Sequence, residues 1–100
     1  MTLLDVNPIA VAGQAAAEGV GTAVTGGMLA GAVPAMAAGG PMGIDEASMM
    51  LFAAIEEHAA HFGVQTGLGV AQRGMFAAQV GVSGASYVAS NGLSAVSLAL

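Results

Sequence analysis

The first half of the chain has the apolar pattern of a helix built from small side chains. Residues 8–38 contain almost nothing polar, and Asn7 and Pro8 before them form a typical helix start, with Asn7 as the cap and Pro8 at the first helical position. The run Gly39-Gly40-Pro41-Met42-Gly43 is the clearest break in the sequence. We therefore expect a helix over about 8–38 and a turn over 39–44.

A second and longer helical pattern follows the turn. Asp45 and Glu46 stand at its start, where carboxylates complement the positive end of the helix dipole. The pattern continues to about residue 91, and we expect residues 92–100 to form a short, frayed tail. The expected fold is all-α, a two-helix antiparallel hairpin over residues 1–91.

The smallest side chains of the second helix recur at seven-residue spacing. Such a stripe follows one line of the helix surface and lets another helix approach the backbone closely. Two interleaved sets form it: Ala60, Gly67, Gly74, Gly81 and Val88, with Gly63, Val70, Ala77 and Gly84 between them. Beside it lie bulky apolar residues, among them Phe52, Ile55 and Phe62.

These faces predict contact with another chain. About twelve glycines inside the two helices cost on the order of 10 kcal/mol relative to alanine, which equals the net stability of a typical domain. A hairpin has one internal interface, so we expect the chain to be unstable alone. The expected partner interface comprises Phe52, Ile55, Phe62, Gly63, Gly67, Val70, Gly74, Ala77, Gly81 and Gly84.

Charge narrows the class of partner. Of 100 residues, six are Asp or Glu and Arg73 is the single cationic side chain. Nucleic acids and anionic membrane surfaces bind clustered Lys and Arg, so neither is an expected partner. There is no cysteine, which excludes disulfides and thiolate zinc sites. Residues 1–13 lack the basic start of a cleaved secretory signal.

Candidate catalytic chemistry is sparse. Glu57, His58 and His61 come near one another on a helix, but a metal site needs three or four converging ligands and the HExxH order is absent. We interpret them as a solvated polar face, with a pH-sensitive partner contact as the alternative. Ser83 and Ser86 belong to no nucleophile motif and are expected to bond to helix carbonyls or to face a partner. We therefore expect no enzymatic activity, cofactor or metal.

Several short motifs, in order and at matching spacing, resemble the PE (Pro-Glu) family of mycobacterial type VII secretion substrates over nearly the whole chain. Asn7-Pro8 lies where the family's Pro-Glu pair begins, although Ile9 replaces the Glu. The stretch from Gly40 to Ser48 is similar to the family's helix-breaking turn, and Phe52 matches an apolar position early in its second helix. Gly84-Ala85-Ser86-Tyr87 matches Gly-Ala-x-Tyr, which opens the YxxxD/E export motif.

The resemblance implies a partner and a route. PE proteins pair with a PPE (Pro-Pro-Glu) protein in a four-helix bundle, a cytosolic chaperone binds through the PPE partner, and the folded pair leaves through a type VII channel to the cell surface or medium. Some relatives act on the host. Tyr87 and Asn91 would form the export signal here, although Asn91 lacks the charge of the family's acidic residue.

A small membrane-embedded hairpin, acting as a pore or an anchor, is the alternative. Residues 19–44 and 74–100 carry no charge and are long enough to span a bilayer. Gly27-xxx-Gly31 and Gly63-xxx-Gly67 also fit the close packing of membrane helices. Against insertion, both segments are rich in Gly and Ala rather than Leu or Phe, and no flanking Lys or Arg would fix an orientation.

Overall fold

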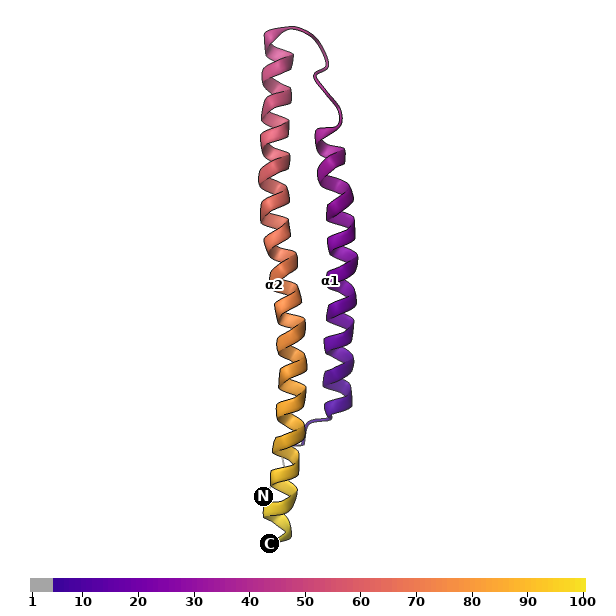
Figure 1. Ribbon diagram of the computed structural model, residues 1–100, viewed down its shortest axis with the longest axis vertical. Helices are drawn as coiled ribbons and strands as arrows, with labels where there is room; N and C mark the ends of the chain where they lie inside the picture. The colour runs from indigo at the N-terminus through magenta and orange to yellow at the C-terminus, as the bar shows by residue number, and fades with distance from the viewer. Residues whose placement is uncertain (1–4) are drawn as a thin grey trace. The chain divides into compact units, whose positions relative to one another are not determined.

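The computed structural model describes residues 5–100, and within that range it contains two helices and no strand (Figure 1). Helix α1 spans Pro8–Ala37 and helix α2 spans Glu46–Ala99. The predicted all-α fold with two helices and one turn is confirmed. Residues 1–4, which belong to the predicted domain and to the stretch searched for a signal sequence, lie outside the described residues.

Helix α1 begins at the predicted Asn7 cap, and α2 begins where Asp45 and Glu46 were predicted to complement the helix dipole, with Asp45 also acting as a cap that was not predicted. The Asn7 side-chain oxygen accepts hydrogen bonds from the backbone N–H groups of Ile9 at 3.0 Å and Ala10 at 3.3 Å. Asp45 does the same for α2, since its carboxylate accepts from the Ser48 N–H at 3.1 Å. Each cap satisfies donors that the first turn of a helix leaves without an intrahelical partner.

The turn lies between Ala37 and Glu46, close to the predicted range. The Ala38 N–H donates to the Ala35 carbonyl at 3.4 Å and tightens the end of α1. Gly40 then adopts φ 65°, in the left-handed region that residues with a Cβ rarely enter. A glycine is therefore required at the point where the chain leaves the first helix.

The expected frayed tail is wrong. Helix α2 continues through residues 92–98 and ends at Ala99. Asn91-Gly92 suggested a stop, but Gly92 tolerates helical dihedrals, and Leu93 to Ala99 contain no proline. Each added residue gains a backbone hydrogen bond once a helix exists, so the helix propagates past a single glycine.

The chain divides into two compact units. Unit 1 consists of Met1–Gly21 and Arg73–Leu100, and unit 2 of Thr22–Gln72. Inside unit 1, Val11 lies against Gly84 and Ala15 against Gly81; inside unit 2, Gly26 lies against Val70 and Val33 against Gly63. Since position numbers rise along α1 while they fall along α2, the two helical segments within each unit are antiparallel.

Neither unit has a core of large side chains. Among the described residues Ala59, 2% exposed, is the only buried hydrophobic side chain. The chain exposes 7193 Å², whereas a compact monomer of this mass exposes about 5,100 Å². Many large hydrophobic side chains of the described residues are therefore exposed to solvent.

Candidate interaction surface

In unit 2, the small-residue stripe of α2 faces α1 of the same chain. A Cβ placed on Gly63 would lie 3.3 Å from Val33 Cγ1, and one placed on Gly26 would lie 3.4 Å from Val70 Cγ1. In each pair a glycine on one helix receives a valine from the other. This alternation lets the helices pack closely with little side-chain bulk.

Unit 1 has the same arrangement on its own segments. Gly84 is buried, and a Cβ placed there would lie 3.2 Å from Val11 Cγ1. The corresponding distance from Gly81 to Ala15 Cβ is 4.0 Å. The predicted partner interface includes Gly63, Val70, Gly81 and Gly84, which lie against α1 within the chain; their contact with a partner stays a prediction.

The remaining predicted interface residues differ in exposure. Gly74, Ala77, Phe52 and Phe62 are partly buried, whereas Gly67 and Ile55 are exposed, Ile55 at 41%. The bulky residues of the set thus keep surface that a partner could cover. Gly63 and Gly84 of the stripe have close contacts within the chain, whereas a Cβ placed on Gly67 would meet nothing within 4 Å.

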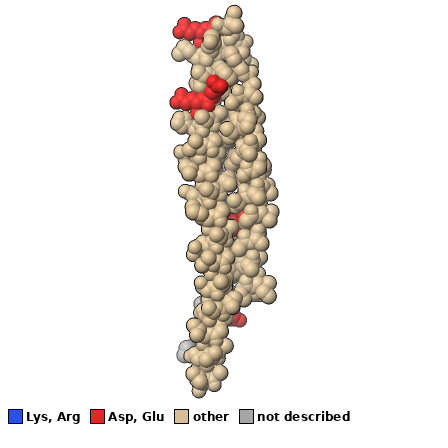
Figure 2. All heavy atoms as spheres, in the orientation of Figure 1, with Lys and Arg blue, Asp and Glu red and all other residues tan. Residues whose placement is uncertain are grey.

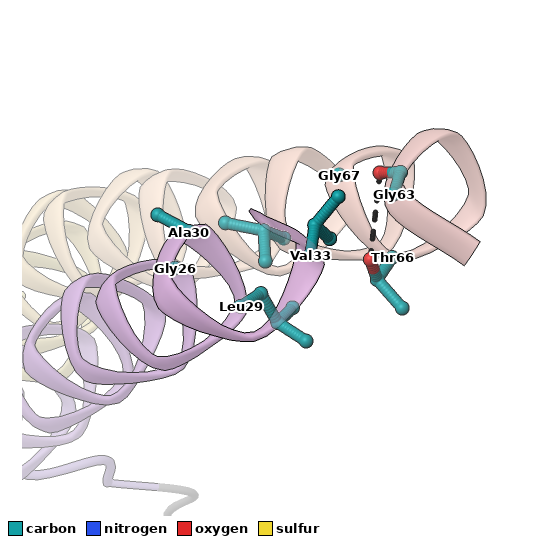
Figure 3. Close-up of a pocket in the computed structure, with 8 residues that line it drawn as sticks. Gly26, Leu29, Ala30, Val33, Gly63, Thr66 and Gly67 are labelled. Atoms are coloured by element: carbon teal, nitrogen blue, oxygen red, sulfur yellow. Dashed lines mark hydrogen bonds between the residues drawn. The ribbon is translucent and has the colours of Figure 1, made fainter. Parts of the chain in front are cut away.

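A groove of about 340 Å³ opens along the two helical segments of unit 2 (Figure 3). The Thr66 hydroxyl donates to the Phe62 carbonyl at 2.6 Å and approaches the Gly63 carbonyl at 3.4 Å. Its polar group is therefore satisfied by its own helix, and the methyl group remains for apolar contact. The lining residues include Leu29, Val33, Gly67 and Val70.

An ion pair joins the two segments of unit 1. Arg73 Nε lies 3.3 Å from Glu18 Oε2, and Gln14 donates to the other Glu18 oxygen at 3.0 Å. The Arg73 and Glu18 side chains are 42% and 22% exposed. The guanidinium also lies directly over Gly21, where any Cβ would collide with it. This pair was not predicted from the sequence, although Arg73 is three residues from Val70 and four from Ala77 along the stripe.

The two residues of the predicted export signal have different surroundings in unit 1. Tyr87 is 39% exposed and borders a shallow groove with Ser83, Ser86 and Ser90. Asn91 is partly buried, and its side-chain N–H₂ donates to the Val6 carbonyl at 2.8 Å. Asn91 therefore holds the segment before α1 against α2, a role that an ionised carboxylate cannot perform because it has no donor.

Polar side chains elsewhere on α2 lie as the sequence indicated. Ser83 donates to the Gln79 carbonyl at 2.9 Å and Ser86 to the Val82 carbonyl at 3.1 Å, as predicted. His61 Nε2 lies 3.7 Å from Glu57 Oε1, with both side chains 76% exposed. Within residues 5–100, no three His, Cys, Asp or Glu side chains are grouped closely enough to hold a metal ion.

Helix α1 is the one described helix that is long and apolar enough to cross a membrane, with a mean hydropathy of 1.4. None of its residues is buried inside the chain. Length and composition alone support this statement, and an apolar helix that packs against a protein partner has the same properties.

Comparisons with protein-family models, with curated proteins and with solved structures give no match for this chain. The interpretation of its surface therefore depends on its own residues and on the motifs that resemble the PE family.

Proposed function

We propose that the chain is a non-enzymatic interaction protein: a PE-like helical hairpin that pairs with a PPE-like helical chain and completes a four-helix bundle. The observation that supports it most strongly is the near absence of a core, with Ala59 as the only buried hydrophobic side chain among the described residues. Apolar surface on this scale marks an interaction site in a protein that works in water. Two further helices are the simplest complement to a helical hairpin.

In this proposal the partner covers the bulky flank of α2 in unit 2. Phe52, Ile55 and Phe62 recur there at three- and seven-residue steps, the spacing at which side chains share one helix face. Ile55 is the most exposed of the three, so it has the most to gain from a partner. Burying an exposed Leu or Ile fully is worth about 1.5–3 kcal/mol.

We further propose that the folded pair leaves the cell by a type VII system and reaches the cell surface or the medium. The support is the resemblance of the Gly84 to Asn91 stretch to the family's export motif, together with the exposure of Tyr87. Tyr87→Ala is expected to abolish export and leave pairing intact, because the ring lies at the surface. Val88→Ala, one residue away, serves as the control, and equal export of both variants would contradict the role of Tyr87.

Co-expression with a PPE protein encoded beside this chain tests the pairing. We expect a one-to-one complex after detergent-free purification, measured by light scattering, and an insoluble or unfolded chain when it is expressed alone. A stable, monomeric chain in the absence of any partner would contradict the proposal.

A pair of variants tests which flank of α2 the partner covers. Ile55 and Val64 are both exposed apolar residues of α2 in unit 2, and their nine-residue separation places them on opposite sides of the helix. Ile55→Lys should weaken the complex by about tenfold or more, whereas Val64→Lys should leave it nearly unchanged. A larger loss of affinity for Val64→Lys than for Ile55→Lys would place the partner on the opposite side of α2.

A membrane-embedded hairpin is the second candidate, and the apolar length of α1 favours it. The ion pair of Glu18 with Arg73 argues against it, because charged groups are costly at bilayer depth. Extraction in alkaline carbonate separates the two functions. An integral hairpin stays with the bilayer, and a protein-paired hairpin is released.

A further inference from the structure

The turn end of unit 2 contains a second groove, of about 240 Å³. Met36 of α1, Met42 of the turn, and Leu51, Phe52 and Ile55 of α2 contribute its apolar lining. Cavities of about 150 Å³ lined by such residues stay dry and accept a benzene ring. This groove therefore has room for one bulky apolar side chain, and its two flexible methionines can adjust to the shape of that side chain.

The apolar surface continues beyond the groove. Met42 and Ile44 are fully exposed, and Leu51 at the groove is 61% exposed. Nothing else in the described chain covers these side chains. They provide contact area around the cavity for a segment that places one side chain inside it.

Carboxylates surround this end of unit 2. Asp45, Glu46, Glu56 and Glu57 are the four charged residues of Thr22–Gln72, a unit without Lys or Arg. In Figure 2, acidic side chains gather in two places near the top of the view, where Figure 1 shows the turn between α1 and α2. The charge of the groove's surroundings is thus uniformly negative.

Two of these carboxylates are placed relative to the groove by local geometry. The Asp45 carboxylate accepts a hydrogen bond from the hydroxyl of Ser48, a lining residue, at 2.7 Å. The Ser48 hydroxyl and N–H both lower the pKa of this carboxyl, which keeps it ionised. Glu56 follows Phe52 by one helical turn, so it lies at the other border of the groove.

The charges exclude the two simplest occupants. A second copy of this chain offers one cation, Arg73, which is paired with Glu18 in unit 1. An anionic membrane surface would be repelled by four carboxylates. The complementary occupant is a protein segment that presents Lys or Arg on both sides of an apolar side chain.

We infer that this turn groove binds a cationic amphipathic segment of a partner protein, with an apolar anchor in the cavity between Met42, Leu51 and Phe52 and basic side chains beside Asp45, Glu46 and Glu56. The inference rests on the proposed pairing, because Phe52 and Ile55 also belong to the proposed interface, and it specifies the chemistry of one end of that interface.

A synthetic amphipathic peptide of Lys and Leu tests it, with a Glu and Leu peptide of the same pattern as the control. Because the chain is expected to be unstable alone, each peptide is present in excess while the full chain is refolded from denaturant in place of a partner, and backbone hydrogen exchange is then followed by mass spectrometry. We expect slower exchange in residues 36–56 with the Lys peptide and no change there with the Glu peptide. Equal protection by both peptides, or protection spread evenly over the chain, would overturn the inference.

Variants at exposed positions separate groove binding from general charge attraction. The single variants Leu51→Ser, Glu46→Lys and Glu56→Lys should each weaken binding of a fluorescent Lys peptide, followed by anisotropy, by about tenfold. Leu68→Ser, equally exposed on α2 but outside the groove, and Asp5→Lys in unit 1 are the matched controls. Asp45 is left unchanged because it caps α2. Equal losses for groove and control variants would overturn the inference.

The outcome is also distinguishable from failure of the proposed pairing. If the PPE complex forms and the Lys peptide protects nothing, the turn groove is not a cationic docking site and the pairing stands. If the peptide protects residues 36–56 and no PPE complex forms, the groove is real and its partner belongs to another family. Insertion of the turn end into vesicles of neutral lipid, with no peptide effect, would also overturn the inference.

Discussion

Asn91→Asp is the most informative single substitution in this chain. It places an acidic residue where the PE export motif, which residues 87–91 resemble, has one, and it changes one side-chain nitrogen to oxygen with almost no change in volume. In the structure, however, that nitrogen donates to the Val6 carbonyl at 2.8 Å. The substitution therefore improves the match to the motif but removes the hydrogen bond between residue 91 and the Val6 carbonyl in unit 1.

The magnitude follows from the lost donor. A buried carbonyl left without its hydrogen bond costs about 1–3 kcal/mol. Asn91 and Val6 are partly buried, so water can replace part of the bond, and about 1 kcal/mol is the appropriate value. A loss of about 1 kcal/mol raises the population of the state in which the segment before α1 has detached from α2 about fivefold. The opening is local, because the bond ties the short segment before α1 to α2.

Hydrogen exchange of the purified complex measures this effect. Amides of residues 5–10 should exchange about fivefold faster in Asn91→Asp than in the natural chain. Asn91→Ala should show nearly the same acceleration without a new charge. Ser90→Asp, on an exposed neighbouring position, introduces the same charge and should show none.

The effect should also depend on pH with a defined sign. A protonated carboxyl at position 91 can donate to the Val6 carbonyl, so folding raises its pKa above the ordinary value of about 3.9. The contact is then present below that pH and is lost as the pH rises through the raised pKa. Unchanged exchange of residues 5–10 at neutral pH would refute the structural role of Asn91. Increased export of the same variant would show that the acidic residue matters to the secretion machinery.

Three further predictions concern stability of the purified complex, measured as thermal unfolding by circular dichroism. Gly84→Leu should destabilise by about 1–3 kcal/mol, because Val11 leaves no room for a side chain; retained stability would contradict the close packing of this seam. Gly69→Ala, where a Cβ meets nothing within 4 Å, should stabilise by about 0.5–1 kcal/mol. Asp45→Ala should lower the melting temperature at neutral pH. Folding lowers the pKa of this carboxyl from 3.8, so the contribution of Asp45 to stability is present above that pH and disappears as the pH falls through the lowered pKa. Asp45→Asn, which keeps a capping oxygen, should retain most of the neutral stability and lose the pH dependence.

Local features of the fold could be predicted because their causes are local. The Asn7 cap, the start of the second helix at Asp45-Glu46 and the turn over 39–44 each depend on residues within a few positions, and the structure contains all three. The end of α2 was mispredicted for the opposite reason. A glycine can end a helix or lie within one. Whether the helix continues past Gly92 depends on the residues after it rather than on the glycine itself.

The assignment of the glycine stripe shows a different limit. Seven-residue spacing identifies a helix face that admits close approach, but it does not say which helix approaches. The answer depends on a matching face elsewhere, and α1 supplies one, with Val11, Ala15, Gly26 and Val33 at the facing positions. A search for that second pattern would have indicated an internal seam before any partner was considered.

The same spacing accounts for an Asn at position 91, where the PE motif that this stretch resembles has an acidic residue. Gly63, Val70, Ala77 and Gly84 follow one another at seven-residue steps, and the next step along α2 is Asn91. The position belongs to the side of α2 that faces α1 in unit 1, where the Val6 carbonyl needs a donor. An ionised carboxylate at position 91 could be recognised by another protein, but it could not donate to the Val6 carbonyl. Asn91 donates to that carbonyl and keeps one acceptor oxygen. Asn91 is therefore accounted for by its contact within unit 1, independently of the resemblance to the export motif.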